Sequence, residues 1–386
     1  MSKTTQVLKK NTMLIALVVI TIFFTINTKG TLLVPQNVTN LIAQNGYVVI
    51  LAIGMLICIL TGGNIDLSVG SVVALVGALA GKLIVTYKIN IYISVIICLL
   101  VGLIIGMWQG YWIAYMRIPA FIVTLSGMLL FRGVALIILD GLTISPFPDN
   151  YLNLFNSFIP DPFAGGEINI LSIVIGSVVC LVYIIFQIYK QISKGKKGYE
   201  TENTIILISK LILISIVIFA LTFSLAKYKG IPIIFILLVA IVLIYHYYLS
   251  KTVPGRYYYA LGGNEKAAKL SGINTNKVLF VAYTNMGFLS AVAALVCVAR
   301  FNSAAPTAGQ SYEMDAIGAC YVGGASAYGG IGTVPGVVIG AIFMGVLNNG
   351  MSIMGIDSNI QKAVKGLVLL AAVVFDVVSK QRTQSV

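Results

Sequence analysis

Charged side chains are scarce in this chain. Asp, Glu, Lys and Arg make up 10% of its 386 residues, against about 25% in soluble globular proteins. Hydrophobic residues make up 59%, and apolar runs of roughly 18 or more residues recur, as spanning helices require. These runs are too long for the strands of a membrane barrel, and lipid admits only helices or closed barrels. The sequence therefore predicts an all-α polytopic membrane protein.

The residues that enzymes and metalloproteins need are also missing. The chain has one histidine, His246, and no Gly-x-x-x-x-Gly-Lys-Ser/Thr motif for binding ATP phosphates. One histidine without clustered cysteines or acids does not build a usual metal site. The cysteines lie in apolar runs without a Cys-x-x-Cys pair, as small buried hydrophobic residues do: Cys58, Cys98, Cys180, Cys297 and Cys320. We expect no metal, no cofactor and no catalytic centre.

Positive charge gathers in four parts of the chain. The 25 Lys and Arg residues exceed the 12 Asp and Glu residues and give a net charge of +13. The clusters are Lys3, Lys9 and Lys10; Lys190, Lys194, Lys196 and Lys197; Lys251, Arg256, Lys266, Lys269 and Lys277; and Lys380 with Arg382. Cytoplasmic loops of membrane proteins carry such an excess. We place all four clusters in the cytoplasm beside membrane lipid, and expect no nucleic-acid partner.

The apolar runs predict a single membrane domain over residues 1–386 with about twelve spans. They lie near 12–28, 42–60, 67–87, 91–115, 120–139, 169–189, 204–226, 231–249, 278–299, 313–329, 334–352 and 363–379. An even number of spans puts both termini on the same side of the membrane, and the basic clusters indicate that this side is the cytoplasm. The runs 67–87 and 313–329 contain glycines or acids, so we expect broken or re-entrant segments near 62–71 and 323–336.

The loops between the spans differ in charge. Residues 140–168 contain three Asp, one Glu and no Lys or Arg, which predicts an external loop. Residues 190–203 form a charged cytoplasmic linker. Residues 251–277 contain five Lys or Arg, one Glu and four Gly, and we expect a cytoplasmic loop that couples the membrane domain to a partner.

Two stretches resemble each other in glycine pattern, residues 62–81 and 323–345. Each has a glycine pair, a break rich in small residues, and then a helix with glycines four residues apart, Gly77 with Gly81 and Gly336 with Gly340. Such spacing lets helix backbones approach closely. Paired interrupted segments in the two halves of a transporter point to its translocation path, although glycine-rich membrane helices are common enough to arise without a repeat.

A short helix is predicted inside the 251–277 loop. Asn264 suits its N-cap, Glu265 its first turn, and Lys269 its last turn, and Gly272 suits the position after its end. The residues that we expect to couple to a partner are Gly262, Gly263, Asn264, Glu265, Ala268, Lys269, Leu270 and Gly272. A helix this short is marginal alone in water. Gly262 and Gly263 are expected to form the turn before it. The helix is therefore either part of a plain interhelical connection or a helix docked on a cytoplasmic subunit.

Polar residues within the apolar runs are candidates for lining a path. A charged side chain in a membrane span marks a functional hypothesis by default. The candidates are Asp66, Ser68, Ser71, Asn348 and Asn349. Each has a structural alternative, since Asp66 also suits the cap of the next helix and the asparagines also suit bonds between helices. Glu313 and Asp315 begin a late span and pose the same question as Asp66, whether they cap a helix or line a path. Arg132 either reaches the membrane surface or pairs with a carboxylate such as Asp66.

Four stretches together resemble one family over almost the whole chain. They are ILTGGNIDLSVGS at 59–71, PAFIVTLSGMLLFRG at 119–133, GRYYYALGGNEKAAKLSGIN at 255–274, and the late region 303–351. The chain resembles the permease subunits of bacterial ATP-binding-cassette (ABC) importers for monosaccharides, in the ribose, galactose and xylose group, with the xylose-type or multiple-sugar members most similar. One departure is Asn64, where many relatives are expected to have a shorter SGIDLSVG stretch.

The resemblance carries further expectations. It implies a homodimer of permeases in the bacterial cytoplasmic membrane, ATP-binding subunits held by residues 255–274, and sugar delivery by an extracytoplasmic binding protein. It also implies ten core spans plus an extra pair, here 169–189 and 204–226. Three alternatives remain: an ABC permease for branched-chain amino acids or nucleosides, an ion-coupled secondary transporter, and a membrane enzyme or scaffold.

Overall fold

The computed structural model describes residues 12–163, 166, 168–199 and 203–384. The N-terminal cluster of Lys3, Lys9 and Lys10 lies outside these residues. Regular structure in the described part is helical: α2 Thr12–Asn27, η1 Thr31–Leu33, α3 Pro35–Leu60, α4 Val69–Gly81 extended by the π-helical turn η2 Lys82–Thr86, α5 Ile91–Ala114, α6 Ala120–Leu139, α7 Asp149–Asn156, α8 Ile170–Lys196, α9 Thr204–Ala226, α10 Ile233–Lys251, α11 Val253–Gly263, α12 Glu265–Leu270, α13 Thr275–Phe301, α14 Tyr312–Val322, α15 Val334–Ile353 and α16 Ser358–Gln384. The predicted all-α membrane class is confirmed.

Nine helices of the described part are long and apolar enough to cross a membrane: α3, α4 with its π turn, α5, α6, α8, α9, α10, α13 and α15. α2 is shorter, and α16 carries charged residues along its 27 residues. The count of twelve spans therefore stays a prediction. A full crossing at 313–329 is wrong: α14 has 11 residues, about 16 Å at a rise of 1.5 Å per residue, which is half of a hydrocarbon core about 30 Å thick.

The chain divides into two compact units, which are described separately. The smaller unit spans Leu33–Ile42 and Ser157–Ile233 and contains α8 and α9, the expected extra pair. These two helices pack on each other, and a Cβ on Gly176 of α8 would meet the Thr222 side chain of α9. Most of their apolar side chains are exposed, as a lipid-facing pair requires.

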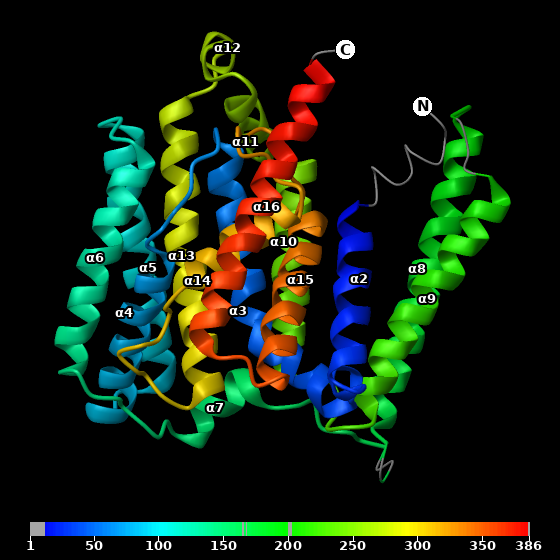
Figure 1. The fold of residues 1–386 in the computed structure, drawn as a ribbon, viewed down its shortest axis with the longest axis horizontal. Helices are drawn as coiled ribbons and strands as arrows, with labels where there is room; N and C mark the ends of the chain where they lie inside the picture. Colours follow the sequence, from blue (N-terminus) through cyan, green and yellow to red (C-terminus); the bar gives the residue numbers. More distant parts are fainter. Residues whose placement is uncertain (1–11, 164–165, 167, 200–202, 385–386) are drawn as a thin grey trace. The chain divides into compact units, whose positions relative to one another are not determined.

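The larger unit is built around α3, in which every residue from Val48 to Leu60 is buried. α13 packs on α4 and α5, α4 packs on α6, and α14 packs on α15 and α16. Figure 1 shows α12 at one end of this unit and α7 at the opposite end, with the end of α16 at the α12 end. The end of α16 and the 251–277 loop therefore lie at the same end of the unit, while the side of the membrane on which they lie stays a prediction.

Both predicted breaks are present in this unit. The backbone is irregular from Thr61 to Ser68 and again from Gly323 to Thr333. Glycines in the left-handed region of φ cause the breaks, including Gly62 at +122° and Gly330 at +69°, because only glycine adopts such angles without steric cost. The helix resumes at Val69 and at Val334, slightly earlier than the predicted ranges 62–71 and 323–336 allow.

The four spaced glycines lie at helix contacts of two kinds. Gly336 and Gly340 of α15 face backbone carbonyls, because a Cβ there would overlap the oxygens of Gly323 and Ala319 respectively. Gly77 and Gly81 of α4 face side chains instead, with a Cβ on Gly77 lying 3.1 Å from Val298 Cγ2. The close backbone approach predicted from the spacing is therefore found on α15, where α14 packs.

Candidate functional site

The short helix of the 251–277 loop has the caps that its sequence predicts. Asn264 Oδ1 accepts a hydrogen bond from the Ala267 amide at 3.0 Å. Gly272 follows the helix with a φ of +84°, and the Ile273 amide donates to the Ala268 carbonyl at 3.1 Å. Since Ala268 is buried and Leu270 is 90% exposed, α12 is held by one side and presents the other to solvent.

The turn expected at Gly262 and Gly263 is wrong. Both glycines are the last residues of α11, which begins after Thr252, whose hydroxyl accepts from the Gly255 amide at 3.1 Å. The chain turns at Asn264, where φ is −163° and ψ is 103°. Gly262 lies against backbone, since a Cβ there would overlap the Leu60 carbonyl oxygen, whereas a Cβ on Gly263 would meet nothing within 4 Å.

An ion pair joins this loop to the turn between α5 and α6. Arg117 Nη1 lies 2.6 Å from Glu265 Oε1, and both side chains are almost half exposed. Arg117 also donates to the Thr275 hydroxyl at 3.2 Å and to the Asn276 side-chain oxygen. The sequence offers no signal for this ion pair, because the two residues are 148 positions apart.

The first group of polar path candidates is enclosed by protein. Asp66 Oδ1 accepts from the Ser68 amide at 2.8 Å and from the Ser68 hydroxyl at 2.7 Å. Gln109 of α5, which the sequence reasoning did not select, donates through Nε2 to Ser68 Oγ at 2.6 Å. Asp66, Ser68 and Ser71 are each at most 2% exposed. Both bonds of Asp66 are made to Ser68, the residue that precedes α4.

A second polar group centres on Asp315 at the start of α14. Its carboxylate lies 2.9 Å from Lys365 Nζ of α16. It also accepts from the Tyr47 hydroxyl of α3 at 2.9 Å and from Asn348 Nδ2 of α15 at 3.3 Å. Four helices therefore meet at one carboxylate that is 1% exposed. Asn349 is buried as well. The ion pair of Lys365 was not predicted, because the sequence of α16 resembles an ordinary span with scattered charged residues.

Arg132 does not pair with Asp66, although it lies close enough to Glu313 for the two charges to interact. Its Nη1 donates to the backbone carbonyls of Pro306 and Ala308, at 3.3 and 2.5 Å. The carbonyls belong to the irregular segment between α13 and α14, so a cation of α6 stabilises that segment. Its hydrogen-bond partners are backbone carbonyls, which cannot be predicted from the types of residue in the sequence.

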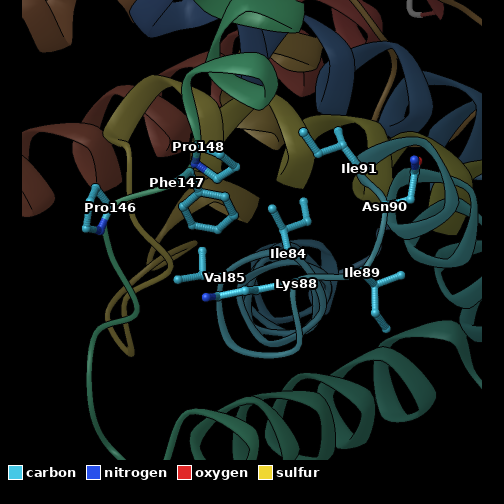
Figure 2. A pocket seen from close by; sticks show the side chains of 9 residues that line it. All are labelled: Ile84, Val85, Lys88, Ile89, Asn90, Ile91, Pro146, Phe147 and Pro148. Atoms are coloured by element: carbon cyan, nitrogen blue, oxygen red, sulfur yellow. The ribbon is translucent and has the colours of Figure 1, made fainter.

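A cavity of the larger unit lies beside the segment that leads into α7. It has a volume of about 540 Å³ and is lined by Ile84, Val85, Lys88, Ile89, Asn90, Ile91, Pro146, Phe147 and Pro148. Figure 2 shows the Phe147 ring beside Ile84 and Val85, next to the segment that leads into α7. None of the predicted path residues lines it. In the part of the chain that the structure describes, no three His, Cys, Asp or Glu side chains gather as a metal site would need.

Comparison with known proteins identifies the family. A family model described as "Branched-chain amino acid transport system / permease component" matches residues 37–159 and 166–373. The chain belongs to this permease family. It is 36% identical over 370 residues to the xylose transport system permease protein XylH of Haemophilus influenzae, covering 96% of both chains. It is 35% identical to XylH of Escherichia coli K12, over 96% of this chain and 92% of the relative.

A second set of relatives is named for ribose instead of xylose. The ribose import permease protein RbsC of Escherichia coli K12 is 33% identical over 354 residues, which cover 92% of this chain and 87% of the relative. No solved structure matches the chain. The resemblance drawn from the four motifs is confirmed: this is an ABC-type permease, a transport subunit rather than an enzyme, in a multi-pass membrane protein family whose importers include an ATPase and a substrate-binding protein.

Proposed function

We propose that this permease imports a monosaccharide, xylose or a related pentose or hexose, into a bacterial cytoplasm. The observation that carries the proposal is the match to xylose and ribose permeases at 33–36% identity over more than nine-tenths of the chain. The family model carries a different substrate in its description. The full-length relatives therefore support a sugar more strongly than a branched-chain amino acid.

A cytoplasmic ATPase drives the transport by binding to α12 and moving it. The helix offers an exposed apolar side chain, Leu270, and an exposed ion pair, Glu265 with Arg117. It is anchored by the buried Ala268 and capped at both ends. A partner that binds α12 therefore moves it as one piece. The residues assigned to this contact are Asn264, Glu265, Lys269 and Leu270.

Two copies of the permease work together, and a sugar-binding protein docks at the end that carries α7. The clustered lysines and arginines support cytoplasmic termini and a cytoplasmic 251–277 loop. The external face then carries residues 140–168 and the cavity beside Phe147. ATP binding and hydrolysis alternate the dimer between outward and inward openings.

The path residues belong to the two helix breaks and the adjoining helices. Asp66, Ser68 and Ser71 lie at the start of α4, and Asn348 and Asn349 lie near the end of α15. Hydroxyl, carboxylate and amide groups suit the hydroxyls of a sugar. Asp66, Ser68, Ser71 and Asn349 are buried in this conformation and Asn348 is half-buried, so access by sugar to the buried groups requires the helices to separate.

Reconstituted transport tests the proposal. The permease is placed in liposomes with its ATPase and sugar-binding protein, and uptake of labelled xylose, ribose, leucine and uridine is measured with and without ATP. We expect ATP-dependent uptake of a sugar. ATP-dependent uptake of leucine or uridine alone would contradict the substrate, and uncoupler-sensitive uptake without the ATPase would contradict the class of transporter.

A further inference from the structure

Three segments that are distant in sequence meet backbone to backbone beside the end of α11. They are the end of α3 with the first break, the end of α11, and the second break. The Gly330 amide of the second break donates to the Leu60 carbonyl of α3 at 3.1 Å. Gly262 of α11 covers this hydrogen bond, because a Cβ on it would overlap both Leu60 O and Gly330 N.

The two breaks also contact each other directly. A Cβ on Gly63 would overlap the Ala327 carbonyl oxygen, and a Cβ on Gly329 would lie 2.5 Å from the Gly62 Cα. Gly63 and Gly329 have φ values of +76° and +84°. No side chain separates the two backbones at these points, so the first and second breaks form one contact.

A polar bond fixes α11 to the same place. The Tyr259 hydroxyl, one turn before Gly262, donates to the Gly332 carbonyl at 3.1 Å. Beyond α11, Asn264 alone separates it from α12. The helix that we assign to the ATPase is therefore one residue away from a helix that touches both breaks.

Backbone contacts of this kind transmit displacement with little loss. Between packed side chains, a shift of one element is partly absorbed when side chains change rotamer. Here the contacting atoms are carbonyls, amides and α-carbons, which have no rotamers, and packed protein interiors are hardly compressible. A shift of α11 by a fraction of an ångström must therefore move Leu60 or Gly330.

We propose that Gly262 and Tyr259 are positioning residues that carry the movement of α12 to both helix breaks at once. The proposal rests on the proposed function, in which an ATPase moves α12. The first break leads into α4 through Asp66 and Ser68, and the second leads into α15. One displacement of α11 thus reorients the starts of both helices to which we assign the path. If the movement of α12 passed only to α13, the next helix in the chain, the contact at Gly262 would not be needed.

The test measures sugar imported per ATP hydrolysed in the reconstituted complex of permease, ATPase and binding protein. The Gly262→Ala variant should assemble, hydrolyse ATP and import about tenfold less sugar per ATP, in the range of coupling changes made by single substitutions. The Tyr259→Phe variant removes one hydroxyl without adding bulk, and its ratio should fall about threefold, the effect of one hydrogen bond.

A matched control is Gly366→Ala in α16, another helical glycine, where a Cβ meets nothing within 4 Å. Its ratio should equal that of the native chain. The inference is overturned if Gly262→Ala keeps the native ratio, or if Gly366→Ala lowers it equally. If Gly262→Ala does not assemble, Tyr259→Phe decides, and a native ratio there overturns the inference. A native complex that hydrolyses no ATP overturns the proposed function itself, and with it this inference.

Discussion

At the scale of single residues, Glu265 is the charged group of α12 whose partner the structure identifies. Replacing it by glutamine removes the ion pair with Arg117, and both groups are almost half exposed. An exposed pair contributes only about 0–1 kcal/mol to stability. We therefore expect Glu265→Gln to keep the thermal midpoint of the purified permease but to lower sugar import per ATP severalfold, because the contact with the ATPase is altered.

The adjacent Lys266 provides the control for Glu265. It is exposed and carries the opposite charge, so Lys266→Gln changes the surface by one charge without touching Arg117. Import per ATP should stay near the native value in this variant. An equal fall in both variants would assign the effect to net charge rather than to the Glu265 contact.

The Asp315 group makes a prediction about stability instead of coupling. Asp315→Asn leaves the Lys365 ammonium, only 15% exposed, without its carboxylate. Breaking a buried ion pair by removing one partner costs about 3–5 kcal/mol. The thermal midpoint in detergent should therefore fall markedly, and adding Lys365→Met to the same chain should recover part of the loss.

The exposed Lys362 of the same helix separates this pair from a general charge effect. Lys362→Met should leave the midpoint of the native chain unchanged and should give no recovery in the Asp315→Asn chain. Recovery by Lys362→Met equal to that by Lys365→Met would show that the Asp315–Lys365 pair does not carry the stability.

At the scale of elements, local patterns predicted local structure well. The caps of α12, the two breaks and the nine long helices follow from apolar length, from Asn264 and from glycines, all of which act within a few residues. The Gly262 contact, the carbonyl partners of Arg132 and the Lys365 pair were missed because each depends on segments far apart in sequence. The crossing expected at 313–329 failed for a related reason: the run was judged by its length, yet the helix α14 ends at Gly323 and Gly324 after 11 residues.

The contact between α14 and α15 yields a prediction for one of the spaced glycines. A methyl group on Gly340 would overlap the Ala319 carbonyl, so the two helices must move apart. Overpacking of this kind costs about 1–3 kcal/mol. Gly340→Ala should lower the thermal midpoint, whereas Gly133→Ala in α6, where a Cβ meets nothing within 4 Å, should not. Equal midpoints for the two variants would remove the case for a required close approach.

At the scale of the whole molecule, the orientation in the membrane follows from where charge and helix ends lie. The larger unit carries α12 at one end and α7 at the other (Figure 1). The basic residues of the 251–277 loop predict that the α12 end lies in the cytoplasm. Leu270 on α12 and Asn150 on α7 are both exposed, and each tolerates a reporter side chain without disturbing the core.

Cysteine labelling determines this orientation. Leu270→Cys should react with a membrane-impermeant maleimide in inside-out vesicles and not in intact cells, and Asn150→Cys should show the reverse. The native chain sets the background, which should be low because four of its five cysteines, all but Cys180, are buried. Labelling of Leu270→Cys in intact cells would put α12 on the wrong side for an ATPase. No cytoplasmic ATPase could then bind α12, and the coupling proposed for α12 and Gly262 would be contradicted, whichever sugar the protein transports.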